Sequence, residues 1–259
     1  MTTGQHYSCA LVDLGTVPYR EAWDLQRRLV EARHEGVIPD VLLLLEHPHT
    51  FTIGRRGDDS EVLASPEYLE SLGATVIEVD RGGLATYHGP GQLVGYPILD
   101  LRPRGREVHS YLRKLEESLI DALQETGIPA QHVPQKTGVW VEDRKIASIG
   151  VRFSRWISSH GFALNVTTDL SYFSHIVPCG MPAVTMTSVA QEFSALREVR
   201  SEPDESAATA IGVPDMALLR SRVAHHLAQV FALQYLDDYP PALDDILGVK
   251  HAATMEAVR

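Results

Sequence analysis

Cysteine is scarce in this sequence, which has only Cys9 and Cys179 in 259 residues. Two cysteines make no disulfide framework of the kind found in small secreted domains, so the composition fits a reducing compartment. Free cysteine is among the most frequently buried residue types, and Cys9 lies inside an apolar segment. We therefore expect Cys9 to be a small core residue, which leaves Cys179 as the candidate working thiol.

Positive charge is also in short supply, because 23 lysines and arginines face 34 aspartates and glutamates, a net charge of −11. Nucleic-acid binding is excluded on this balance, since a basic face is its usual footprint. No apolar run approaches the roughly 18 residues that span a membrane. The first residues show no basic region followed by an apolar core, as a signal peptide would. We expect a cytoplasmic protein that binds neither nucleic acid nor membrane.

Metal-ligating patterns are missing as well. His47 and His49 flank Pro48, but no third ligand follows at a recognisable spacing. A structural or pocket-lining role is the better interpretation of this pair. We expect no metal and no cofactor.

Apolar patterns predict strands separated by helices, which indicates an α/β or α+β fold in a single domain over residues 1–259. The expected strands are 7–14, 40–46, 74–79, 93–101 and 160–166, with a hairpin of 138–141 and 145–153. The expected helices are 18–36, 65–70, 108–125 and 216–233. Two further segments carry weak patterns. Residues 194–214 are polar and read as a flexible insert, and 240–259 as a mobile tail.

The densest polar chemistry lies in residues 81–96, R-G-G-L-A-T-Y-H-G-P-G-Q-L-V-G-Y, where five of sixteen residues are glycine. Glycine is normally kept out of strands, so its repetition suggests a close backbone approach or turns with positive φ. Donors and acceptors on Arg81, Thr86, Tyr87, His88 and Gln92 surround these glycines. A site held between two apolar strands is one interpretation. A purely structural turn region with bulges is the other.

Cys179 stands between Pro178 and Gly180, in a constrained turn that suits a plain core cysteine poorly. A thiol becomes a useful nucleophile only when a neighbour stabilises its thiolate. Lys145, His88 and His160 could each be that neighbour. Spacing alone does not choose among them, because such partners meet in the fold and not along the sequence.

At this point the chain resembles a known family. The 81–96 segment, then K-I-A-S-I-G-V with the following H-G-F-A-L-N-V, then P-C-G-M, are similar to the lipoyl(octanoyl) transferases of lipoate biosynthesis. Together with the apolar L-L-L-E-H-P strand, these motifs cover roughly residues 10–190 in the family's order. One mild departure is Met181, which stands where a branched aliphatic residue is common.

The resemblance implies a fold and an activity. The fold would be a mixed sheet flanked by helices, similar to the catalytic domain of biotin– and lipoate–protein ligases. The enzyme would move an octanoyl group from octanoyl-acyl carrier protein to a specific lysine of lipoyl domains. The acceptors would be the lipoyl domains of 2-oxoacid dehydrogenases and the glycine cleavage H protein. We expect a monomer.

The resemblance also implies residue roles. Cys179 matches the cysteine that carries the acyl group as a thioester, and Lys145 matches the lysine that lowers its pKa. Three segments match those that line the substrate pocket: Arg81, Gly82, Gly83, Leu84, Ala85, Thr86, Tyr87 and His88; Ser148, Ile149 and Gly150; Gly161, Phe162 and Ala163. Because both protein partners are typically acidic, a local basic patch is expected, with Arg55, Arg56, Arg102, Arg104, Arg152 and Arg155 as candidates.

Three other functions remain open on the sequence. A lipoate–protein ligase would use ATP and an equivalent lysine, but it would not need Cys179, and no G-x-x-x-x-G-K-[ST] loop is present. A cysteine hydrolase would pair Cys179 with His88 or His160. A non-catalytic acyl-carrier-binding module would bind without turnover.

Overall fold

The computed structural model describes residues 6–178, 184–200 and 213–248. Cys179 and Met181, and residues 201–212 and 249–259 of the expected insert and tail, lie outside the described residues. None of the helices in the described part of the chain is long and apolar enough to cross a lipid bilayer.

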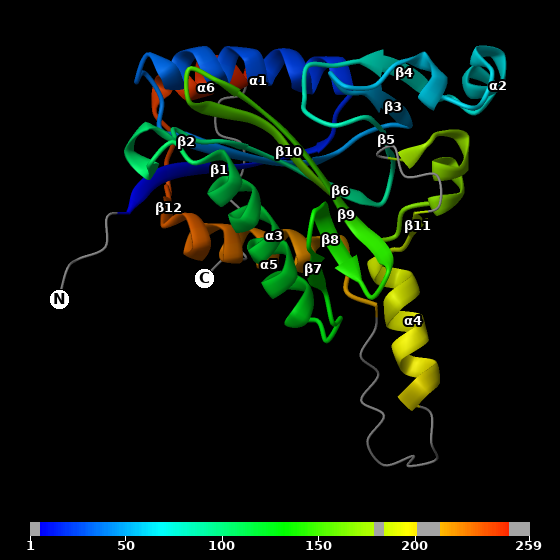
Figure 1. Cartoon of the computed structure of the whole chain (residues 1–259). Coiled ribbons are helices and arrows are strands. Elements are labelled where there is room, and N and C mark those ends of the chain that lie inside the picture. Colours follow the sequence, from blue (N-terminus) through cyan, green and yellow to red (C-terminus); the bar gives the residue numbers. More distant parts are fainter. Residues whose placement is uncertain (1–5, 179–183, 201–212, 249–259) are drawn as a thin grey trace.

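The described residues form one large mixed sheet and one small sheet (Figure 1). The large sheet has the order β12-β1-β2-β6-β10-β9-β8-β7, and β11 pairs with β9 off this path. Its strands are β1 Tyr7–Thr16, β2 Asp40–Glu46, β6 Gln92–Ile98, β7 Gln131–Val133, β8 Lys136–Val141, β9 Arg144–Ser154, β10 Ile157–Asn165, β11 Thr185–Met186 and β12 Leu233–Tyr235. The pairs β12–β1, β1–β2 and β11–β9 are parallel, and the other pairs are antiparallel.

The small sheet has the order β4-β3-β5, with β3 Thr50–Ile53, β4 Thr75–Glu78 and β5 Ala85–His88. β5 lies inside the glycine-rich segment, where we had expected only turns and donors between two strands. Its four residues are buried, and its Tyr87 pairs with Phe51 of β3. A four-residue strand enclosed by glycines leaves too short an apolar pattern to be read from sequence.

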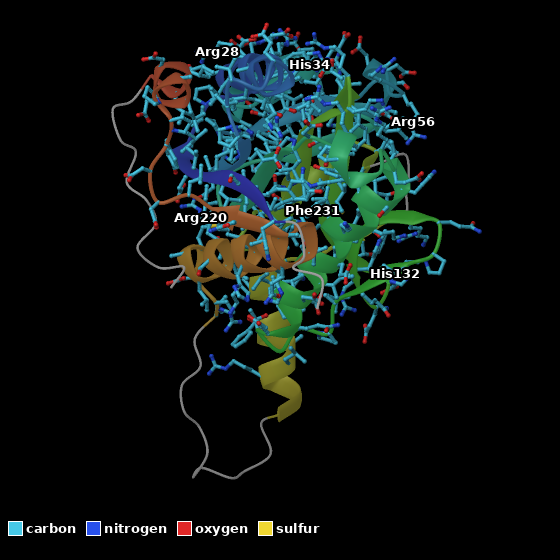
Figure 2. The ribbon with its side chains drawn as sticks, turned by 90° about the vertical axis from the view of Figure 1, so that its left-hand side faces the viewer. Arg28, His34, Arg56, His132, Arg220 and Phe231 are labelled. Atoms are coloured by element: carbon cyan, nitrogen blue, oxygen red, sulfur yellow. The ribbon has the colours of Figure 1, made fainter. Side chains whose placement is uncertain are left out.

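Helices cover both faces of the large sheet (Figures 1 and 2). The helices α1 Tyr19–His34 and α6 Pro241–Leu247 lie on one face, and α3 Val108–Gln124 and α5 Met216–Phe231 on the other. The short α2 Pro66–Ser71 begins at Ser65, whose hydroxyl accepts a hydrogen bond from the Tyr68 amide, as a helix cap does. Three 3₁₀ turns lie at Asp59–Glu61, Arg102–Arg104 and Leu170–His175.

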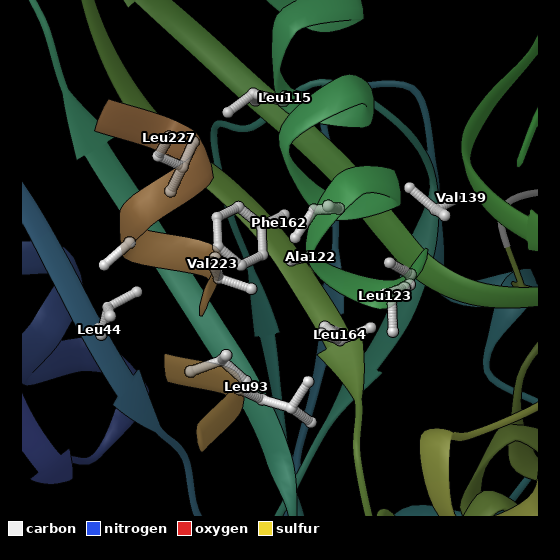
Figure 3. Close-up of a cluster of buried hydrophobic side chains, with 14 of the residues drawn as sticks. Leu44, Leu93, Leu115, Ala122, Leu123, Val139, Phe162, Leu164, Val223 and Leu227 are labelled. Carbon is white, nitrogen blue, oxygen red and sulfur yellow. The ribbon is translucent and has the colours of Figure 1, made fainter. Parts of the chain in front are cut away.

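The two covered faces explain the apolar run of β2. Val41, Leu43 and Leu45 pack in the cluster beneath α1 and α6. Leu42 and Leu44 point to the opposite face and pack beneath α3 and α5 (Figure 3). A strand buried on both sides needs apolar residues at every position, so the alternation of a half-exposed strand is absent. The predicted strand at 40–46 is confirmed.

The expectation of a flexible insert is wrong for residues 194–200, which belong to helix α4 Val189–Arg200. The start of α4 is fixed because Arg144 of β9 makes a bidentate ion pair with Glu192, at 2.8 and 3.0 Å. Further along, the helix projects away from the sheet (Figure 1). Ser194, Ala195 and Arg197 are exposed, which is why their polar pattern resembled a loop.

The expectation of a mobile tail is wrong for residues 241–247, which form α6. Leu243 is fully buried and packs in the cluster beneath α1. A helix of seven residues carries only one buried position here, so it leaves no periodic signal in the sequence.

Buried ion pairs join α1 to the start of β2 and to Asp100, which follows β6. Asp40 is 1% exposed and pairs with Arg33 at 2.8 Å and with Arg104 at 2.6 Å. The Arg102 guanidinium bonds to Asp100, and its hydrogen bonds together with Arg33 hold the pKa of Asp100 below its usual range against the opposing effect of burial. Arg102 and Arg104 therefore neutralise carboxylates of their own chain.

Two other arginines of the expected basic patch are also paired. Arg152 bonds to Asp80, and Arg155 to Glu31. The expected patch of six arginines is therefore wrong for four of them. Arg55 and Arg56 remain as exposed candidates.

Replacing Asp40 by asparagine should lower the free energy of unfolding by about 3 kcal/mol, because the buried Arg104 loses its carboxylate. Asp24→Asn is the matched control, since its pair with Arg27 is largely exposed and such pairs contribute little. Urea unfolding followed by tryptophan fluorescence measures both. Equal losses in the two variants would contradict a special role for the buried pair.

Candidate active site

Residues from three distant segments meet around one cavity of about 220 Å³. From the expected set, its lining includes Arg81, Gly83, Leu84, Thr86 and His88; Lys145, Ser148, Ile149 and Gly150; Gly161, Phe162 and Ala163. Gly82, Ala85 and Tyr87 belong to the same segments but do not line the cavity. Cys179 lies outside the described residues, so its position relative to the cavity is a matter for proposal.

Strand pairing brings the second and third segments together. β9 and β10 are antiparallel, with Ser148 opposite Ala163, Ile149 opposite Phe162 and Gly150 opposite Gly161. β8 pairs with β9 only as far as Ala147. Beyond that point the first segment approaches β9, and the Gly82 amide donates to the Val151 carbonyl at 2.9 Å.

Two glycines, which have no side chain, make this approach possible. A Cβ on Gly150 would lie 2.9 Å from the Gly82 carbonyl oxygen, closer than real Cβ contacts. A Cβ on Gly161 would collide with the Gly95 carbonyl oxygen of β6. The small residues of β9 and β10 were expected to admit another backbone or a ligand, and at these two positions the neighbour is backbone.

Lys145 and Arg81 are both buried cationic side chains of the cavity wall, and Lys145 is the less exposed of the two at 2%. Its Nζ lies 5.5 Å from the centre of the ring of Trp140. Trp140 is the residue of β8 that pairs with Lys145 of β9. This distance is within the range of cation–π attraction. Gly138, at φ +125°, leaves room for the lysine, because a Cβ there would lie 2.7 Å from Lys145 Cε.

The backbone of Lys145 also meets the chain that follows Cys179. Met186 of β11 pairs with Lys145, and the Thr187 amide donates to the Lys145 carbonyl at 3.0 Å. On the other side of residues 179–183, the Val177 amide donates to the Glu61 carbonyl at 2.8 Å. The Glu61 carboxylate accepts from the Ala85 amide at 2.6 Å, next to Leu84 in the cavity wall. Both flanks are thus tied to segments that form the cavity.

His88 is held by a chain of amides. Its Nδ1 lies 2.9 Å from Gln92 Oε1, Gln92 Nε2 donates to Asn165 Oδ1 at 3.0 Å, and Asn165 Nδ2 donates to the Thr187 carbonyl at 3.0 Å. Burial lowers the pKa of His88 well below its usual value, and the nearby His47 and Arg81 lower it further. His88 is therefore neutral at pH 7.

His160 is neutral for the same reason. Burial, reinforced by Arg81 and Arg152, lowers its pKa to about 3. Its Nε2 lies 2.8 Å from the Asp80 carboxylate, which can only accept, so Nε2 carries the proton. Nδ1 then accepts from the Tyr19 hydroxyl at 3.4 Å.

His47 and His49, the pair that flanks Pro48, have different partners. His47 Nδ1 donates to the Val17 carbonyl at 2.6 Å, and its Nε2 lies 2.7 Å from the Tyr96 hydroxyl. His49 Nδ1 lies 2.7 Å from the Tyr87 hydroxyl. Burial lowers the pKa of His47 to about 4, although the bond to Val17 opposes this shift.

Sequence reasoning missed several lining residues. Arg56 was expected only in the basic patch, and it also lines the cavity. The others are Tyr19, Tyr96, Gln135, Lys136 and Thr137. Tyr19 is the first residue of α1 after Pro18, and helix starts carry no signal of the cavity they face. Gln135 and Lys136 lie at the turn into β8, where Gln135 has φ +66°.

The chain is similar in sequence to known proteins. The model of the lipoyl protein ligase A/B catalytic domain family matches residues 18–203. The chain is 46% identical over 231 residues to the octanoyltransferase of Solibacter usitatus. The aligned region covers 88% of this chain and 96% of that protein. The chain is 57% identical over 180 residues to the octanoyltransferase of Rubrobacter xylanophilus, covering 69% and 80%. The chain belongs to the octanoyltransferase family. It is therefore an acyltransferase.

Solved structures support the fold. A bipartite lipoate protein ligase of Thermoplasma acidophilum aligns with a TM-score of 0.64 at 17% identity, covering 93% of this chain and 91% of that one. A lipoate-protein ligase A bound with ATP aligns with a TM-score of 0.65 at 17% identity, covering 93% and 92%. The expected mixed sheet flanked by helices, similar to lipoate–protein ligases, is confirmed.

Gly138→Ala should disturb Lys145 directly. The new Cβ would clash with Lys145 Cε and with the Ala147 carbonyl oxygen at 2.6 Å. Gly127→Ala is the matched control, because Gly127 also has positive φ but nothing lies within 4 Å of its Cβ. We expect the control to lose about 1 kcal/mol of stability from backbone strain. Gly138→Ala should lose about 2 kcal/mol more from overpacking, and its acyltransferase rate should fall at least tenfold. Similar rates in the two variants would contradict this account.

The buried histidines should make the fold sensitive to acid. In the unfolded chain, His47 takes up a proton near pH 6.5, whereas in the fold it does so only near pH 4. Between these values the unfolded state binds more protons, so stability falls as pH falls, by about 1.4 kcal/mol per pH unit for one histidine. His47→Gln, which can keep both hydrogen bonds, should reduce the slope of unfolding free energy by up to that amount between pH 6 and 4.5. Urea unfolding at several pH values measures it, and an unchanged slope would contradict the assignment.

Proposed function

We propose that this protein transfers an octanoyl group from octanoyl-acyl carrier protein to a specific lysine of lipoyl domains, through a thioester on Cys179. The reaction would serve lipoate biosynthesis. The octanoyltransferase relatives support the acyl group, and the family resemblance of the three motifs supports the donor and the acceptors.

One observation carries the proposal. Lys145 stands in the cavity wall, and the strand that follows residues 179–183 pairs with it directly. On the other flank, Val177 is tied to Glu61, whose carboxylate accepts from the Ala85 amide next to Leu84 in the cavity wall. This connection favours a position for Cys179 at the cavity, near Lys145.

The charges favour Lys145 over the two histidines as the partner of Cys179. A thiolate is stabilised by a nearby cation. His88 and His160 are neutral at pH 7 because burial lowers the pKa of each. An uncharged imidazole cannot supply that attraction. The lowered pKa also makes each imidazole a weak base, which weakens a cysteine hydrolase that would depend on either histidine.

In the first step, the Cys179 thiolate attacks the carbonyl carbon of the octanoyl thioester. The tetrahedral intermediate collapses by breaking the bond to the phosphopantetheine sulfur, which leaves as a thiolate and takes a proton from the Lys145 ammonium. One thioester is exchanged for another, so the step is nearly isoenergetic. Division of the transfer into two easier steps is the usual benefit of a covalent intermediate.

In the second step, the amine of the acceptor lysine attacks the Cys179 thioester. The new C–N bond forms, the C–S bond breaks, and Cys179 leaves as a thiolate. The proton of the amine passes to Lys145, which is thereby restored to the ammonium form. No metal, nucleotide or redox partner is needed to balance either step.

The cavity suits an acyl chain of this size. A cavity of about 150 Å³ is known to hold a six-carbon ring, and this one measures about 220 Å³. Apolar surface from Leu84, Ile149 and Phe162 contributes to its wall. Enclosure would also protect the thioester from water.

Mixing the protein with octanoyl-acyl carrier protein should add the mass of one octanoyl group to the intact chain. Hydroxylamine should remove the adduct, and a lipoyl domain should discharge it. Cys179→Ser should form no thioester, whereas Cys9→Ala, the matched control in the buried core, should behave as wild type. If instead only ATP and free octanoate modify the lipoyl domain, the protein is a ligase. Binding without turnover would indicate a carrier-binding module.

Lys145→Ala should raise the pKa of the Cys179 thiol, because the thiolate loses its cation. The variant is best made in a Cys9→Ala background, which leaves a single thiol. The pH dependence of its alkylation rate by iodoacetamide gives the pKa. Lys114→Ala on α3 is the control. An identical thiol titration in the Lys145 variant and the control would reject the proposed pair.

A further inference from the structure

Tyr19 occupies a special position between two hollows. Among the residues that the structure describes, it is shared by the lining of the 220 Å³ cavity and of a second hollow of about 570 Å³. The second hollow lies over the start of α1 and the edge of the small sheet, and its other lining residues are Pro18, Arg20, Glu21, Pro48, His49, Thr50, Gly73, Thr75, Val76 and Ile77.

The tyrosine is held from both sides. Toward the cavity, its ring centre lies 5.4 Å from that of His88, and its hydroxyl lies 3.4 Å from His160 Nδ1. On the other side, it packs in a small apolar cluster with Ile77 and Val79. Ile77 itself lines the second hollow. Tyr19 is only 3% exposed, so its side chain is buried among these neighbours.

Strand register places Tyr19 and Lys145 toward different ends of the cavity. Lys145 is the second residue of β9, whereas His160, the partner of the Tyr19 hydroxyl, lies opposite Val151, six residues further along. An acyl chain whose carbonyl is at Lys145 therefore extends toward Tyr19. The far end of that chain is its terminal methyl group.

We propose that the Tyr19 ring closes the end of the acyl cavity and so limits the length of the acyl chain that the enzyme accepts. This inference rests on the proposed octanoyl transfer, which it deepens. Without the ring, the cavity would open toward the second hollow, and additional methylene groups could be buried there. Each newly buried methylene favours the longer chain by about fourfold.

The test compares acyl-acyl carrier proteins of increasing chain length, from octanoyl through decanoyl to dodecanoyl. For Tyr19→Ala and Tyr19→Leu, the ratio of kcat/KM for dodecanoyl to that for octanoyl should rise at least tenfold over wild type. Tyr19→Phe keeps the ring and loses only the hydroxyl, so its preference should stay with octanoyl. Tyr111→Leu is a matched control, since Tyr111 is equally buried (3% exposed) but lies on α3 and packs in the core on the other face of the sheet. Its chain-length ratio should not change even if its stability falls.

Several outcomes would overturn the inference. Unchanged ratios in both Tyr19→Ala and Tyr19→Leu would do so, as would an equal loss of rate for every chain length. A shift in Tyr19→Phe as large as in Tyr19→Leu would assign the effect to the hydroxyl and reject closure by the ring.

A binding measurement separates this inference from the proposed function. Calorimetric titration with free octanoate and dodecanoate reports the cavity without any transfer. If wild type binds octanoate but transfers nothing, the proposed function fails. The shift of affinity toward dodecanoate in Tyr19→Ala then decides the inference by itself. If wild type binds neither acid and transfers nothing, both are rejected.

Discussion

The cavity exists because three backbones approach one another more closely than side chains would allow. Gly82 bonds to β9, Gly150 leaves room for that bond, and Gly161 leaves room for the carbonyl of Gly95 in β6. A single methyl group at Gly150 or Gly161 would separate these segments. The glycines therefore allow the backbones that form the cavity walls to come into contact. The positions of the polar side chains beside them depend on this contact.

Burial then decides which groups carry charge. His47, His88 and His160 all have lowered pKa values because the fold removes water from around them. Their hydrogen bonds to Tyr96, Gln92 and Tyr19 fix the orientation of each ring. Of these histidines, His88 and His160 line the cavity and make a polar but uncharged part of its wall, beside the buried cationic side chains of Arg81 and Lys145.

Long regular patterns could be predicted from the sequence, and short or tertiary features could not. The β2 strand, the α3 helix and the hairpin of β8 and β9 contain enough apolar positions to be predicted from the sequence. α6 has one buried position, and β5 is four residues long, so neither left a pattern. The ion pairs of Arg104 and Arg152 depend on residues 64 and 72 positions away, which no local signal reveals.

In the candidate site too, local motifs could be predicted from the sequence and tertiary neighbours could not. Eleven residues of the three matched segments line one cavity together with Lys145, because the motifs are local stretches of chain. Tyr19 and Tyr96 join them only through the packing of α1 and β6 onto β10. Likewise, the argument that favours Lys145 over His88 and His160 rests on the burial of the two histidines, which spacing does not encode.

The pairing of β11 with β9 has a consequence for how such an enzyme can change. The five residues 179–183 are bracketed by Val177, bonded to Glu61, and by Thr185 and Met186, bonded to β9. Among the described strands of the large sheet, none includes a residue between these anchors. In the proposed mechanism, the nucleophile and the described residues that line the cavity therefore belong to separate parts of the chain, so either part can be altered by evolution or design while the other is kept.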